Sequence, residues 1–161
     1  GYGEVGTNMK RIAAMISAGS PTKIYYTNFG GFDTHASQAT SQALLFNQLG
    51  DAVIGFLLDM KRIGRADDVA VLMFTEFGRR VKENASFGTD HGVASPMFIA
   101  ANKLKGGFYS QHPSLTDLDE GDLKMTTDFR RVYATMMKEW LGYDDANAVL
   151  KGNYPTLGVF A

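Results

Sequence analysis

An uninterrupted run of six apolar residues at 69–74 constrains the fold more than any other feature of the sequence. The largely charged segment 65–68 precedes this run, which begins with a β-branched valine. An apolar run of this length without alternation is typical of a β-strand that is covered on both faces. In α/β proteins with such strands, ligands bind beyond the carboxyl ends of the strands, and Glu76 stands at this point. The sequence therefore predicts an α/β fold with a polar site at this end of its sheet.

Two further segments have the composition of strands, and helical patterns lie between them. Residues 24–29 and 96–101 are rich in aliphatic and aromatic side chains. Apolar residues recur at helical spacing over about 4–18 and again over about 45–63. The strand at 24–29, the long helix and the strand at 69–74 are therefore expected to form a βαβ unit. Its two strands would be parallel and would end at the same edge of the sheet.

The carboxy-terminal third of the chain has a different pattern. Residues 102–125 are rich in Gly, Asp and Ser, which predicts a surface loop with at most a short strand. A helical pattern follows at 127–141, with Thr127 as the predicted N-cap, and a short helix is expected at 144–150.

Length and composition limit the class of protein. A chain of 161 residues that is 45% hydrophobic normally forms one domain, so residues 1–161 are expected to be a single α/β domain. No apolar run reaches the roughly 18 residues that a membrane crossing requires. The net charge of −1 and the scattered basic residues argue against a nucleic-acid partner. Because the sequence has no cysteine, disulfides and thiolate-bound zinc are excluded, while the cytoplasm and the periplasm both stay open.

Polar side chains suited to a divalent metal stand in the loops beside the three predicted strands. Carboxylates and neutral imidazoles on convergent loops are the usual ligands of zinc, manganese, magnesium and calcium. These loops contain two of the three histidines in the chain. We therefore expect one or two divalent ions at the rim of the sheet. The predicted ligands are Asp33, His35, Glu76, Asp90 and His91.

Each predicted ligand also has a structural interpretation. Asp33 is suited to capping the long helix, His35 to its first turn, and Asp90 with His91 to a turn before a strand. Taken singly, each residue favours the structural interpretation, because structural carboxylates and histidines outnumber ligands. Taken together beside the strand ends, the set favours a metal.

Other charged residues carry weaker signals. Arg79 and Arg80 are candidates for binding an anion, since guanidinium groups match phosphate and sulfate oxygens, although paired arginines also occur on solvated faces. His112, which precedes a proline, is either a distant ligand or a packed loop residue. The acidic run at 117–122 lacks the spacing of a helix-loop-helix calcium site and is predicted to be a solvated turn.

Five motifs together resemble one known family. They are Gly-Gly-Phe-Asp-Thr-His at 30–35, Phe-Thr-Glu-Phe-Gly-Arg-Arg at 74–80, Gly-Thr-Asp-His-Gly at 88–92, His-Pro-Ser-Leu-Thr-Asp-Leu at 112–118 and Thr-Asp-Phe-Arg-Arg-Val-Tyr-Ala at 127–134. From Ile24 to Leu150 the chain resembles the carboxy-terminal part of the DUF1501 proteins, a bacterial family of unknown function related to the alkaline phosphatase and sulfatase superfamily.

The resemblance implies a three-layer α/β/α sandwich with a mostly parallel sheet, present here as a partial domain. It also implies one or two divalent metals at the carboxyl ends of the strands. Asp33 and His35 then resemble the Asp and His that one loop gives to one metal. Glu76 resembles the Asp of an Asp-His-Gly motif in which Phe77 replaces the His.

Two alignments remain open for the last histidine. In the preferred one, His91 resembles the late histidine of the first metal, and Asp90 binds directly or orients His91. In the other, Asp90, His91 and Gly92 are the Asp-His-Gly motif and His112 is the late histidine. Phe77 removes a ligand and puts the second metal in doubt.

The implied activity is hydrolysis of phosphate or sulfate esters, with a small-molecule or glycan ester as substrate and a periplasmic or exported location. The nucleophile of the superfamily lies in an amino-terminal half for which this sequence has no counterpart. The alternative is a non-catalytic module that holds a structural metal or binds a glycan or partner protein. As a partial domain, the chain is expected to expose a strand edge that another copy or the missing amino-terminal part covers.

Overall fold

The computed structural model describes residues 3–160, which fall into two compact units. The first unit is Gly1–Val69 with Lys82–Asp90, and the second is Ala70–Val81 with His91–Ala161. The chain therefore passes between the units three times, after Val69, after Val81 and after Asp90. The expectation of a single domain over residues 1–161 stays a prediction.

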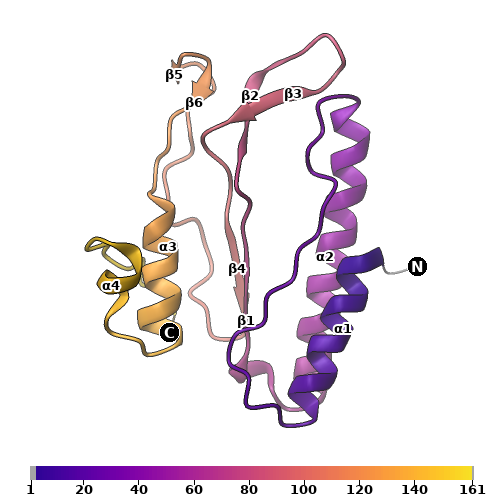
Figure 1. Cartoon of the computed structure of the whole chain (residues 1–161), viewed down its shortest axis with the longest axis vertical. Coiled ribbons are helices and arrows are strands. Elements are labelled where there is room, and N and C mark those ends of the chain that lie inside the picture. Colours follow the sequence, from indigo (N-terminus) through magenta and orange to yellow (C-terminus); the bar gives the residue numbers. More distant parts are fainter. Residues whose placement is uncertain (1–2, 161) are drawn as a thin grey trace. The chain divides into compact units, whose positions relative to one another are not determined.

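Two helices build the first unit. Helix α1 (Gly3–Ser17) and helix α2 (Gln38–Arg62) lie side by side and run in the same direction (Figure 1). The structure thus confirms the two helices that the spacing of apolar residues predicted. Gly64, with a φ of +73°, follows the end of α2 and adopts the left-handed conformation that glycine favours there. The buried side chains of the pair are Val5, Ala13, Ala52, Val53, Phe56 and Met60.

The segment between these helices is extended but unpaired. Tyr25, Thr27 and Phe29 are half-buried, and Ile24, Tyr26 and Asn28 between them are exposed. This alternation is that of a β-strand with one covered face. Among residues 3–160, however, no strand pairs with it, and the backbone of residues 23–31 makes no hydrogen bond.

The strands of the chain form short antiparallel pairs. β1 (Ala70–Met73) pairs with β4 (Phe98–Ala101), with Ala70 opposite Ala101 and Met73 opposite Phe98. β2 (Gly78–Glu83) pairs with β3 (Thr89–Gly92). β5 (Leu118–Asp119) pairs with β6 (Asp122–Leu123) through Glu120 and Gly121, which both have positive φ. Two such residues are typical of a tight hairpin turn.

The predicted α/β/α sandwich with a mostly parallel sheet is wrong, since the described strand pairs are short and antiparallel. The predicted strands at 69–74 and 96–101 do form as β1 and β4. The segment between them was expected to be a loop and contains the β2–β3 hairpin. A parallel β1–β4 pair would require a crossover connection, whereas this hairpin returns the chain in the opposite direction, so β1 and β4 are antiparallel. Residues 24–29 join no ladder, so the βαβ unit is also absent from the described residues.

Helices of the second unit follow the β5–β6 hairpin. Helix α3 (Phe129–Thr135) continues into the π-helical segment η2 (Met136–Trp140), and α4 (Ala146–Leu150) comes next. The N-cap of α3 is Asp128, which accepts a hydrogen bond from the backbone N–H of Arg130 at 2.9 Å. The prediction of Thr127 as the cap is therefore wrong by one residue. The pKa of Asp128 is lowered mainly by its side-chain hydrogen bonds with Arg130.

By length and composition alone, α2 is long and apolar enough to cross a membrane. The core helix of a soluble protein passes the same test, so this finding is weak evidence. Helix α2 packs against α1, and Phe56 and Met60 are among its buried residues. The expectation that the chain has no membrane span stays a prediction.

Glu139, in the π-helical segment, holds the end of the second unit. Its two carboxylate oxygens accept hydrogen bonds from the backbone N–H groups of Gly158, at 2.8 Å, and Phe160, at 3.3 Å. Burial raises the pKa of Glu139, but hydrogen bonds from Thr156 and from the 158–160 backbone outweigh this effect, so the pKa lies below its ordinary value of 4.5. The carboxylate therefore stabilises the folded tail only while it is ionised.

Acid is expected to release this tail. Because the folded pKa of Glu139 is lowered, its contribution is complete above the unfolded value and is lost as the pH falls through the folded value. Trp140, the single tryptophan of the chain, packs against Phe160 with 5.1 Å between ring centroids, so its fluorescence reports on the tail. We expect Glu139→Gln to flatten the fluorescence change that the wild-type protein shows below pH 4.5. Identical acid titrations of the two proteins would contradict this assignment.

Candidate metal site

The tip of the β2–β3 hairpin fixes the loop that carries Asp33 and His35. The backbone N–H of Ser37 donates to the carbonyl of Ser86 at 3.0 Å, and that of Gln38 donates to the carbonyl of Phe87 at 2.8 Å. Ser37 is the N-cap of α2 but makes no side-chain cap bond. Carbonyl groups of the hairpin thus satisfy the donors that lead into the helix.

Asn84 ties the same two segments together. Its amide donates to the carbonyl of His35 at 3.0 Å, and its side-chain oxygen accepts from the N–H groups of Ser86 and Gly88. A Cβ atom on Gly88 would lie only 2.2 Å from the carbonyl carbon of His35, so the two backbones are in direct contact. The position of His35 is therefore set by the hairpin as well as by its own loop.

Buried hydroxyl groups complete the connection. Thr34 and Thr89 are both buried, and both donate to the side-chain oxygen of Gln38, at 3.3 Å and 2.8 Å. This oxygen is shared between the loop and strand β3. The shared acceptor holds residue 90, the next residue of β3, close to the loop.

His35 lies between two carboxylates. Its Nε2 is 3.1 Å from Oδ1 of Asp33, and its Nδ1 is 3.6 Å from Oδ1 of Asp90. The three side chains are between 48% and 66% exposed, so solvent reaches all of them. Both ring nitrogens therefore face a negative group, and all three residues belong to the first unit.

This arrangement fits one side of a divalent metal site. With metal–ligand bonds of about 2.0–2.1 Å, neighbouring donor atoms lie roughly 3.0–3.4 Å apart. The separation of 3.1 Å between Asp33 and His35 matches this spacing. A carboxylate at the other ring nitrogen, the place of Asp90, is what normally orients a metal-bound histidine. The exposure of the group argues against a closed structural site.

Other predicted ligands lie in the second unit. The ring of His91 stacks on Phe77, with centroids 4.0 Å apart, and the guanidinium of Arg79 lies 5.1 Å from the centroid of the same ring. Glu76 is exposed and accepts a hydrogen bond from the hydroxyl of Thr75 at 3.4 Å. His91 follows Asp90 directly in the chain and is exposed, like Asp33 and His35.

The remaining predicted residues have local partners. Arg80 donates to Asp122 at 3.1 Å and to the carbonyl of Glu120 at 2.8 Å, so it holds the β5–β6 turn. His112 is exposed, and its Nδ1 lies 2.9 Å from the carbonyl oxygen of Pro113. Of the two predicted arginines, Arg80 is thus already committed to a structural contact.

Sequence reasoning missed Asn84 and Gln38, which position the candidate ligands. Asn84 begins an Asn-Ala-Ser-Phe-Gly stretch between two strands. An Asn side chain that bonds the backbone two residues later is a common turn feature, so this signal was available. Gln38 offered no comparable signal, because its role depends on the approach of Thr89.

Comparison with known proteins identifies a family. A family model described as "Protein of unknown function (DUF1501)" matches residues 8–152. No curated protein and no solved structure matches the chain. The comparisons therefore give a family without naming an activity.

Proposed function

The chain belongs to the DUF1501 family, and we propose that it binds a divalent cation through Asp33 and His35, with Asp90 orienting His35, for the hydrolysis of phosphate or sulfate esters. One observation carries the proposal: Asp33 and Asp90 stand on opposite nitrogens of the His35 ring, at 3.1 and 3.6 Å.

Each residue has a distinct role. Asp33 supplies negative charge, and His35 supplies a neutral nitrogen on the side that faces Asp33. With a cation between Nε2 and Asp33, the ring proton resides on Nδ1, and the negative charge of Asp90, 3.6 Å from Nδ1, favours this tautomer. When bound, a divalent cation polarises an ester oxygen and lowers the pKa of a bound water.

The substrate class and location are also proposals. Arg79 carries a guanidinium, a group that recognises phosphate and sulfate oxygens. The family resemblance implies that the substrate is a small-molecule or glycan ester and that the protein is exported or periplasmic. The family match over residues 8–152 supports this resemblance.

The test combines metal content with turnover. The purified protein is analysed for bound metal, titrated with Zn²⁺ or Mn²⁺, and assayed with chromogenic phosphate and sulfate esters. We expect a bound cation and ester turnover that requires it. Failure to bind any of these cations would reject the metal site together with the hydrolase proposal.

A second candidate is a non-catalytic module that holds a metal. Phe77 favours it, because this ring stacks on His91 at the position where the resemblance places a histidine ligand. A phenyl ring cannot bind a metal, so a second ion loses a ligand there. Cation binding without turnover of either ester would favour this module over the hydrolase.

Asp90→Asn is expected to weaken the cation site while keeping the shape of the side chain. The amide no longer provides the charge that holds the His35 proton, and loss of such an orienting partner typically costs about tenfold in metal affinity. Calorimetric titration of Zn²⁺ measures the change. An unaltered affinity would mean that Asp90 does not orient His35.

A further inference from the structure

The extended segment 23–29 is a strand without a partner. Its side chains alternate between half-buried and exposed, and its backbone makes no hydrogen bond within residues 3–160. Ile24 and Tyr26, on the open face, are 70% and 79% exposed. An extended backbone of this kind presents a row of free donors and acceptors to any chain that can lie alongside it.

The segment also lacks the features that protect natural strand edges. Residues 24–29 contain no charged residue and no proline, and they are rich in aromatic and β-branched side chains. Edges are normally protected by charges, proline or bulges. The partner whose hydrogen-bonding groups fit these backbone donors and acceptors is therefore another extended polypeptide.

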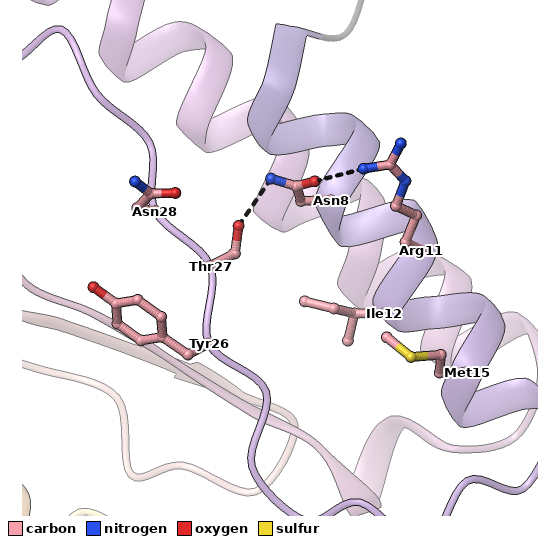
Figure 2. A pocket seen from close by; sticks show the side chains of 7 residues that line it. All are labelled: Asn8, Arg11, Ile12, Met15, Tyr26, Thr27 and Asn28. Atoms are coloured by element: carbon pink, nitrogen blue, oxygen red, sulfur yellow. Dashed lines mark hydrogen bonds between the residues drawn. The ribbon is translucent and has the colours of Figure 1, made fainter.

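Helix α1 holds the segment in the extended form. The amide of Asn8 donates to the hydroxyl of Thr27 at 3.0 Å (Figure 2). Beside this contact lies an open hollow of about 360 Å³, with Ile12 and Met15 of α1 on one side and Tyr26 on the other (Figure 2). A strand that docks here meets a prearranged backbone, which lowers the entropy cost of binding.

We infer that this segment pairs antiparallel with the same segment of a second copy of the chain. A two-fold axis beside Tyr26 places Tyr26 opposite Tyr26 of the other copy and Ile24 opposite Asn28. This register keeps the covered and open faces of the two strands aligned. It opposes no like charges, because the only nearby charge, Lys23, falls opposite Phe29. The segment is thus self-complementary, as a two-fold interface requires.

Charge exchange at Tyr26 tests the pairing. Tyr26→Lys and Tyr26→Glu each place two like charges face to face on the axis, and each alone is expected to weaken dimerisation roughly tenfold or more. An equimolar mixture of the two variants is expected to associate again, because Lys then faces Glu. Sedimentation velocity over a range of concentrations gives the dissociation constants, and hydrogen exchange of the 24–29 amides locates the contact.

The control variant is Phe108→Lys, which makes a similar change at a fully exposed aromatic residue outside the segment. It is expected to dimerise like the wild type. A monomeric wild type, an unweakened Tyr26→Lys variant, or a mixture that fails to associate would each overturn the inference. Protection of the same amides by a different polypeptide, with this chain monomeric, would also overturn it and assign the edge to that partner. Metal binding is expected to be unchanged in the Tyr26 and Phe108 variants, so the outcome of this test is independent of the outcome of the metal-binding test.

Discussion

Replacing His35 with alanine is expected to remove divalent-cation binding. His35 supplies the nitrogen that lies 3.1 Å from Asp33, and it is also the group through which Asp90 acts. Its loss leaves two exposed carboxylates without the imidazole between them. Since loss of an orienting partner alone costs about 10–100-fold, loss of the ligand is expected to cost roughly a hundredfold or more in affinity. Calorimetric titration with Zn²⁺ and elemental analysis of the purified variant measure this effect.

The matched control is His112→Ala. His112 is also exposed, and its Nδ1 lies 2.9 Å from the carbonyl oxygen of the next residue, Pro113, so its removal should leave the affinity unchanged. If His35→Ala bound Zn²⁺ as tightly as His112→Ala, the metal would have to bind elsewhere.

The helices could be predicted because their signals are local. Spacing of apolar residues located α1 and α2, and the glycine at 64 marked the end of the second helix. These patterns arise because one face of each helix is buried, and they are the same whichever part of the chain buries that face. The partner of a strand is not encoded locally in this way. Residues 24–29 have the composition and the alternation of a strand, yet they pair with nothing in the described part of the chain.

The candidate ligands were predicted by residue type, and their pairing required the structure. Asp33 and His35 lie in one loop, so their proximity follows from the sequence. Asp90 was expected to bind a metal or to orient His91, whereas the structure places it beside His35. That contact depends on the hairpin tip docking against the start of α2, a tertiary contact between residues about fifty positions apart.

Gly88→Ala is expected to disrupt this docking. The added Cβ would lie 2.2 Å from the carbonyl carbon of His35, 2.3 Å from its oxygen and 2.6 Å from the backbone nitrogen of Ala36. Backbone atoms cannot move aside as the end of a flexible side chain can, so the hairpin tip has to shift. The shift strains the two backbone hydrogen bonds at Ser37 and Gln38 and the bond from Asn84 to His35.

The expected loss is about 2–4 kcal/mol in the free energy of unfolding, from overpacking of roughly 1–3 kcal/mol and the weakened hydrogen bonds. Urea unfolding measures it, and Zn²⁺ affinity should fall as well, because Asp90 moves away from His35. Gly55→Ala is the control: this residue lies within α2 with nothing within 4 Å of an added Cβ, so alanine should be neutral or stabilising there. Equal unfolding free energies for Gly88→Ala and the wild type would show that hairpin and loop are not in contact, and Asp90 would then have no fixed position beside His35.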